Sequence, residues 1–121
     1  MNVRRWGAPL RWAAVIVVVS SLPMPAVQTP PGTDKGIHAF LYLVLGILAA
    51  RALISERTAR VWQLLVLLLV LVAFGGLDEL HQRWIPGRTA DPKDWVADSA
   101  GSVAGVVAGL FSARRRPARA L

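Results

Sequence analysis

Four apolar segments divide this chain, with charged or turn-forming residues between them. They cover residues 12–27, 37–54, 61–77 and 95–113. A helix needs about 20 mainly apolar residues to cross a bilayer, and about 17 is near the lower limit. We therefore predict one all-α domain over residues 1–121, an integral membrane bundle of four transmembrane helices. Tryptophans near the segment ends are typical of membrane interfaces; they are Trp12, Trp62, Trp84 and Trp95.

The first segment shares two features with a signal peptide, namely a basic start and a short apolar core. Arg4, Arg5 and Arg11 precede the core, and Pro23 and Pro25 interrupt the segment late. No small-x-small cleavage site follows cleanly. We therefore expect an uncleaved first span.

The composition agrees with a membrane protein. Of the 121 residues, 55% are hydrophobic and only 17% are charged, below the usual quarter. The absence of cysteine excludes disulfides and thiolate metal sites. The net charge of +7 comes from basic residues that flank the apolar segments. This placement favours anionic membrane lipids as the partner and gives no indication of nucleic-acid binding.

The distribution of basic residues predicts the orientation in the membrane. Ten of the 14 lie in the two termini or between segments two and three: Arg4, Arg5, Arg11, Arg51, Arg57, Arg60, Arg114, Arg115, Arg116 and Arg119. By the positive-inside rule, both termini are cytoplasmic and residues 23–36 and 78–94 face outward. Six of the seven acids, all except Glu56, belong to the outer side. The expected location is a bacterial plasma membrane.

Polar residues recur at helical spacing on this outer side. Asp34, His38 and Tyr42 are four residues apart, so they share one helix face. The same interval relates Asp78 to Gln82, Glu79 to Arg83, and Asp94 to Asp98 and Ser102. Three helix ends thus deliver polar groups to one side, and Glu79 and Arg83 are candidates for an ion pair.

Several of these residues also have a simple structural interpretation. Asp91 precedes Pro92 and is expected to cap the last helix, while Asp94 would complement the helix dipole. Lys35 would extend its ammonium to the interface. We expect His81 to be exposed. Asp98 lies one turn deeper, where an acid requires a buried partner or a function.

Together these observations predict a shallow polar pocket at the outer interface. Arg88 would contribute a guanidinium able to bind phosphate or carboxylate through two contacts. The candidate ligand-binding residues are Asp34, Lys35, His38, Tyr42, Asp78, Glu79, Gln82, Arg88, Asp94 and Asp98.

Gly101, Gly105 and Gly109 form a small-residue row in the fourth segment. Such rows let two helix backbones approach closely in a membrane. We interpret the row as packing within the chain, with a homodimer contact as the alternative.

Three stretches resemble the VanZ-like family of small integral membrane proteins. They are DKGIHAFLY (residues 34–42), DELHQRWIPGRTADPKD (residues 78–94) and DSAG (residues 98–101). The resemblance implies a multi-span membrane domain with a polar signature at its helix ends. It also implies a link, in some members, to the action of teicoplanin-type glycopeptides. The family pattern usually shows Asn where this chain has Asp98.

Three functions follow as hypotheses. The first is binding or modulation of a lipid-linked or anionic envelope component, such as a lipid-linked cell-wall precursor, with an effect on glycopeptide susceptibility. The second is a metal-dependent membrane enzyme acting on a lipid phosphoester or acyl group, because the acids and His38 suit a divalent metal. The spacing matches no specific metal signature, so no cofactor is assigned. The third and least favoured hypothesis is proton-coupled transport, because transporters commonly contain internal repeats and none is visible in this sequence.

Overall fold

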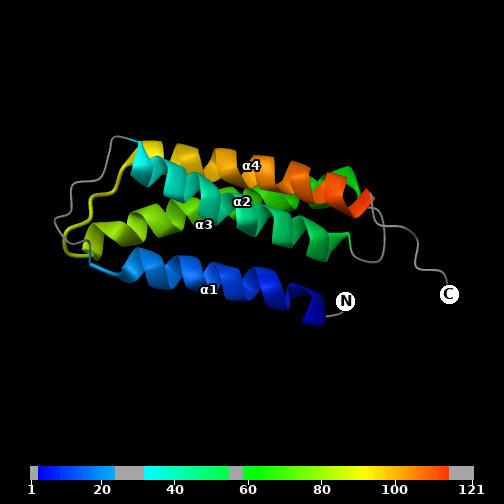
Figure 1. The fold of residues 1–121 in the computed structure, drawn as a ribbon, viewed down its shortest axis with the longest axis horizontal. Helices are drawn as coiled ribbons and strands as arrows, with labels where there is room; N and C mark the ends of the chain where they lie inside the picture. Colours follow the sequence, from blue (N-terminus) through cyan, green and yellow to red (C-terminus); the bar gives the residue numbers. More distant parts are fainter. Residues whose placement is uncertain (1–2, 24–31, 55–58, 115–121) are drawn as a thin grey trace.

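The computed structural model describes residues 3–23, 32–54 and 59–114 (Figure 1). Every regular element within these ranges is helical, as predicted. The α-helices are α1 (Gly7–Ser21), α2 (Thr33–Leu53), α3 (Val61–His81) and α4 (Pro92–Arg114), with short 3-10 helices η1 (Val3–Trp6) and η2 (Gln82–Trp84).

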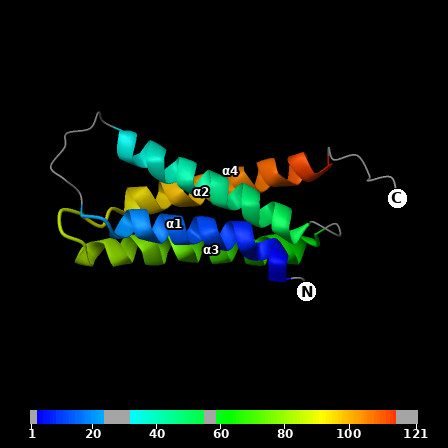
Figure 2. The same ribbon diagram turned by 60° about the horizontal axis from the view of Figure 1, so that its bottom comes forward.

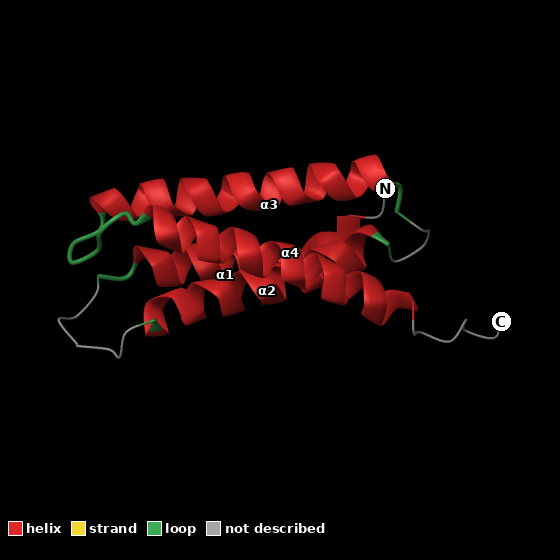
Figure 3. Ribbon diagram, turned by 90° about the horizontal axis from the view of Figure 1, so that it is seen from above, coloured by secondary structure: helices red, strands yellow, loops and turns green. Residues whose placement is uncertain are grey.

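Successive helices run antiparallel, so the polar helix ends meet at one end of the bundle. The C-terminal ends of α1 and α3 lie there with the N-terminal ends of α2 and α4 (Figure 1). The start of α1 and the end of α4 lie together at the opposite end. Helix α3 runs along one edge of the bundle (Figure 3). We call the first of these ends the polar end.

Three helical segments are long and apolar enough to cross a membrane. They are Thr33–Leu53, Val61–Trp84 and Pro92–Ala113. Apolar side chains on the outside of α3, such as Leu65 and Leu69, are exposed, as expected for contact with lipid. Helix α1 alone has 15 residues, below the length of a full membrane crossing, but η1 directly precedes it and extends the helical segment to residues 3–21.

Helix α1 begins and ends earlier than the predicted 12–27 segment. It begins at Gly7 because Pro9 lies in the first turn, where a missing N–H leaves no hydrogen bond unmade. It ends at Ser21 because Pro23 favours an extended conformation at Leu22, whose φ and ψ are −75° and 134°. Residues 24–27 lie outside the described residues.

Helix α3 continues one turn beyond Leu77, the predicted end. The prediction placed Asp78 and Glu79 just beyond the span, in the outward-facing segment 78–94, although at helical spacing to Gln82 and Arg83. Both side chains are buried instead, because this turn faces the inside of the bundle. The acids therefore belong to the helix, which ends at His81.

The most extensive helix contact joins α2 to α4, which cross each other in Figure 2. A Cβ added to Gly101 or Gly105 would overlap backbone carbonyls of α2. One added to Gly46 would lie 2.6 Å from the carbonyl oxygen of Ser102, and one at Gly109 would lie 2.8 Å from Cβ of Ala50. The glycine row therefore packs within the chain, as interpreted from the sequence.

Helix α1 is attached to this pair by an apolar core and one hydrogen bond. Ile16 is 0% exposed and packs in the cluster that contains Tyr42 and Leu45 of α2. The indole nitrogen of Trp12 donates to the backbone oxygen of Leu41 at 2.8 Å. These contacts hold the middle of α1 against residues 41–45 of α2.

Replacing Gly105 with Leu should reduce the yield of folded protein in detergent. The new side chain meets the α2 backbone, which cannot move aside, so we expect a loss of at least about 2 kcal/mol of stability. Ala104→Leu is the matched control, because Ala104 is exposed. Equal thermal stability of the two variants would show that α2 and α4 are not in close contact.

Candidate functional site

The polar end of the bundle encloses a set of buried acids around His38. We define the polar cluster as Asp34, Lys35, His38, Tyr42, Asp78, Glu79, Asp94 and Asp98. Helices α2, α3 and α4 each contribute members. Two glycines of α3 permit this convergence: a Cβ on Gly75 would lie 3.1 Å from Cβ of Asp98, and one on Gly76 would lie 3.4 Å from the indole nitrogen of Trp95.

His38 lies at the centre of the polar cluster. Its Nδ1 is 2.7 Å from Oδ1 of Asp98, a short hydrogen bond between α2 and α4. Its Nε2 is 3.7 Å from Oδ1 of Asp34 and 3.9 Å from Oδ2 of Asp94, both too long for hydrogen bonds. One imidazole therefore has carboxylates on both of its nitrogen sides.

Asp78 connects three helices. Its Oδ2 accepts hydrogen bonds from the hydroxyl of Tyr42 at 3.2 Å and from the hydroxyl of Ser20 at 3.0 Å. The Tyr42 ring also contacts Phe74, with centroids 5.9 Å apart. The sequence analysis did not select Ser20, because a lone serine late in an apolar helix carries no specific signal.

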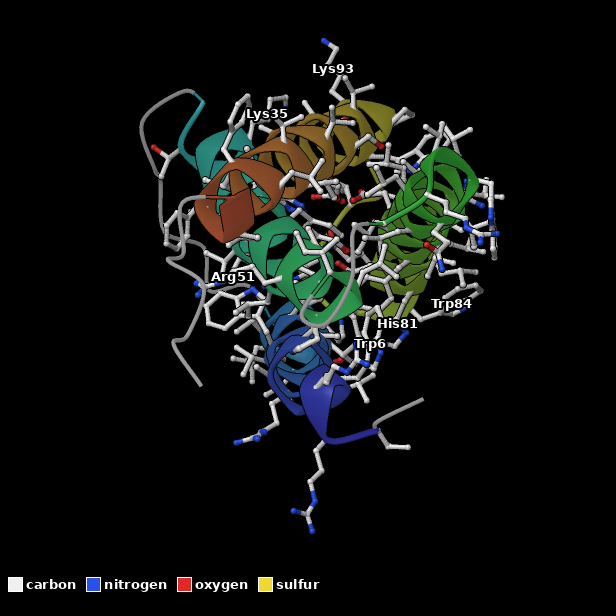
Figure 4. The ribbon with its side chains drawn as sticks, turned by 90° about the vertical axis from the view of Figure 1, so that its right-hand side faces the viewer. Trp6, Lys35, Arg51, His81, Trp84 and Lys93 are labelled. Carbon is white, nitrogen blue, oxygen red and sulfur yellow. The ribbon has the colours of Figure 1, made fainter. Side chains whose placement is uncertain are left out.

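Lys35 forms ion pairs across the helix ends. Its ammonium is 3.2 Å from Oδ1 of Asp94 and 3.3 Å from Oδ2 of Asp91. Asp91 also accepts a hydrogen bond from the backbone N–H of Lys93 at 2.9 Å, so it caps α4 as predicted. This backbone bond and the Lys35 ammonium both lower the pKa of the Asp91 carboxyl. Lys93 itself points away from the bundle (Figure 4).

Glu79 does not form the expected pair with Arg83. Its Oε1 instead accepts a hydrogen bond from the backbone N–H of Asp91 at 2.5 Å.

Four buried polar atoms of the polar end and its surroundings have no hydrogen-bond partner: Oε2 of Glu79, Nε2 of Gln82, Oδ2 of Asp98 and Oγ of Ser102. Such atoms are rare in folded proteins because each loses its water without compensation.

Arg88 lies apart from most of the acids. Its Nε and Nη2 donate to the backbone oxygens of Leu22 and Val19 at 2.9 and 3.1 Å. The last carbonyls of a helix have no partner within the helix, so Arg88 provides hydrogen-bond donors for the carbonyls at this end of α1.

The same helix end contacts α3, where Oγ of Ser21 is 3.2 Å from Nε2 of the exposed His81. His81 and Trp84 lie on the α3 side of the bundle (Figure 4).

Two hollows adjoin the polar cluster. A cavity of about 140 Å³ lies among α1, α2 and α3, and its polar lining is Ser20, Asp34, His38, Tyr42, Asp78 and Arg88. A larger groove of about 400 Å³, which we call the α3–α4 groove, is lined by Gly76, Glu79, Leu80, Arg83, Ala90, Pro92 and Trp95. Glu79 belongs to both the polar cluster and this groove.

The polar cluster holds more acids than bases. Its carboxylates are Asp34, Asp78, Glu79, Asp94 and Asp98, against the ammonium of Lys35 and the imidazole of His38. Buried charge of one sign is costly unless a counter-charge is close. Two triads place ligand atoms within 4.8 Å of one another, Asp34 with His38 and Asp94, and His38 with Glu79 and Asp98. The cluster can therefore accept protons or a cation.

The candidate residues predicted from the sequence thus fall into three groups in space. Most of them form the polar cluster, and Gln82 is buried on the following turn of α3. Arg88 reaches the small cavity while its donors hold α1. Sequence reasoning missed Ser20 and the groove residues Arg83 and Trp95.

Comparison with known proteins identifies the family. The family model described as VanZ/LLP1 matches residues 6–112, nearly the whole chain, so the chain belongs to this family. The resemblance inferred from the three motifs is confirmed. No curated protein and no solved structure matches the chain.

The Arg88 contact can be tested by cross-linking, because the chain contains no cysteine. Ser21→Cys combined with His81→Cys should be joined by a short bifunctional thiol cross-linker, since Oγ of Ser21 lies 3.2 Å from Nε2 of His81. Adding Arg88→Ala should slow this cross-linking about threefold or more, because the charged hydrogen bonds that hold α1 are lost. Arg83→Ala is the control. Equal rates in the two triple variants would show that Arg88 does not position α1.

Proposed function

We propose that this VanZ/LLP1 protein crosses the bacterial plasma membrane four times, with both termini in the cytoplasm. Three candidate spans and the antiparallel order of the helices support this topology. Arg51 and Arg60 belong to the end opposite the polar end, where the positive-inside rule expects the cytoplasm. Of the other residues used for the orientation, Glu56, Arg57, Arg115, Arg116 and Arg119 lie outside the described residues.

We further propose that the outward-facing polar end binds an anionic, lipid-linked component of the cell envelope. One observation carries this proposal: Glu79 joins the buried polar cluster to the lateral α3–α4 groove. The groove has an apolar wall that includes Leu80 and Trp95, suited to an acyl or prenyl chain. Arg83 lies in the same groove and provides a guanidinium for a phosphate.

In this proposal Arg83 binds the anion, and Arg88 holds the end of α1. A lipid could enter the groove sideways from the membrane, with its chain beside Trp95 and its head toward the polar cluster. Lipid-linked cell-wall precursors carry phosphate groups and a long apolar chain, so they have the required chemistry. An effect on survival under teicoplanin-type glycopeptides would follow if such a precursor is held or redirected.

A second candidate function is metal-dependent chemistry on a lipid phosphoester or acyl group. The observation that favours it is the contact between His38 and carboxylates from two helices. A bound metal at such a place would activate water or polarise a phosphoryl oxygen. Conversion of a lipid by the purified protein, followed by mass spectrometry, distinguishes this function from binding alone.

Reporter fusions test the topology. A reporter fused after residue 121 or inserted at residue 57 should read cytoplasmic, and one inserted at residue 30 should read external. This follows because the basic residues flank the first two positions and the acids adjoin the third. A cytoplasmic signal at residue 30 would reverse the orientation and remove the outward-facing site.

Binding of a polyprenyl diphosphate to the purified full chain tests the lipid site. Arg83→Gln should weaken binding about tenfold, because a charge-assisted hydrogen bond is lost. Lys93→Gln removes the same charge from the same end of the bundle and should leave the affinity unchanged, since Lys93 points outward (Figure 4). The uncharged polyprenol should bind more weakly than the diphosphate to the wild-type protein.

The outcome that contradicts the proposal is equal affinity of wild type and Arg83→Gln for the diphosphate. In cells, expression of the wild type or of Lys93→Gln should change survival under a teicoplanin-type glycopeptide relative to cells without the protein. Expression of Arg83→Gln should change it less. Membrane abundance of each variant must be measured alongside, so that poor insertion is not mistaken for loss of binding.

A further inference from the structure

Two buried acids of the polar cluster each leave one oxygen without a partner. Asp98 is 1% exposed and Glu79 is 6% exposed. Oδ1 of Asp98 contacts His38 and Oε1 of Glu79 accepts from a backbone N–H, whereas Oδ2 and Oε2 have no hydrogen bond. These two oxygens are buried from solvent and have no donor among the described residues.

The same two residues form a triad with His38. One ligand atom from each of the three side chains lies within 4.8 Å of the other two. Each residue comes from a different helix: His38 from α2, Glu79 from α3 and Asp98 from α4. Two carboxylates and one imidazole at this spacing are a suitable donor set for a small divalent cation.

We propose that His38, Glu79 and Asp98 bind one divalent transition-metal ion, such as Mn²⁺ or Zn²⁺, inside the bundle. The ion supplies the positive charge that the two unpartnered oxygens lack. It joins α2, α3 and α4 at a single point. Carboxylates suit Mn²⁺ and imidazole suits Zn²⁺, so both ions are probes of the site.

The neighbouring triad of Asp34, His38 and Asp94 serves a supporting role in this proposal. Asp94 already has a cation, because Lys35 lies 3.2 Å from its Oδ1. The Asp34 side chain is 43% exposed, so water can solvate its charge. With the metal on Nδ1 of His38, the other ring nitrogen faces these two carboxylates at 3.7 and 3.9 Å. Carboxylates on that side of the ring are the usual neighbours of metal-ligating histidines.

The metal also resolves an electrostatic difficulty of the proposed lipid site. A phosphate that approaches the polar cluster through the α3–α4 groove meets Glu79, a like charge. A divalent ion bound to Glu79 reverses the local charge and can itself coordinate a phosphate oxygen. This consequence rests on the proposed function, whereas the metal site rests on the side-chain geometry alone.

Metal binding is tested on the full chain in detergent after treatment with EDTA. Titration with Mn²⁺, followed by the electron paramagnetic resonance of free Mn²⁺, should show one ion bound per chain. Glu79→Gln and Asp98→Asn keep the side-chain volume and should each weaken binding by about tenfold or more. Asp91→Asn is the control, because Asn also caps helices and Asp91 lies outside the triad. The bound ion should show coupling to a histidine nitrogen that is lost in His38→Gln.

A thermal melt of each variant without metal shows that it is folded, and Mn²⁺ should raise the melting temperature of wild type but not of Glu79→Gln. Failure of wild type to bind either Mn²⁺ or Zn²⁺ would overturn the metal site. It would also be overturned if Asp34→Asn weakened metal binding while Glu79→Gln did not.

Binding of the polyprenyl diphosphate is measured separately. Metal binding without diphosphate binding contradicts the proposed function alone, and diphosphate binding that EDTA leaves unchanged contradicts the bridging role alone.

Discussion

The close approach of α2 and α4 is the constraint on which the polar end depends. Glycines on both helices remove the side chains that would otherwise separate the two backbones. Only at this separation does Nδ1 of His38 come within 2.7 Å of Asp98. Membrane helices gain little from hydrophobic association with each other, so close packing and buried hydrogen bonds must provide much of their attraction. The glycine row and the histidine–carboxylate bond therefore support each other.

Helix α3 adds two buried acids to the pair formed by α2 and α4. The glycines at 75 and 76 let it approach α4, and its last turn brings Asp78 and Glu79 inside the bundle. Burial in a medium of low dielectric strengthens each hydrogen bond and makes each unpaired charge more costly. Asp78 is satisfied by two hydroxyls, whereas Glu79 keeps one oxygen without a partner. Within the same turn, the two acids therefore differ: Asp78 connects three helices, and Glu79 is the acid to which the proposed metal site assigns a cation.

Membership in the VanZ/LLP1 family covers nearly the whole chain, and the motifs that indicated it map onto the polar end. Asp34 and His38 come from the first motif, and Asp78 and Glu79 begin the second. The third motif begins with Asp98, where the family pattern usually shows Asn. An amide there would still bind His38 but would bring one negative charge fewer. Because this chain has the acid, its polar cluster has a greater need for a cation than that of a member with Asn.

The sequence by itself determined the helical class, the apolar segments and the face shared by Asp34, His38 and Tyr42, because helical periodicity and hydrophobicity are local properties. It also identified the glycine row and the capping role of Asp91. Only the tertiary structure decided which acids meet, since contacts between α2, α3 and α4 depend on packing between distant segments. For the same reason Arg88 proved to hold the end of α1, and Ser20 proved to bind Asp78. The end of α3 differs from the prediction because burial outweighs polarity there. The helix continues through Asp78 and Glu79, whose partners lie on α1, on α2 and just before α4.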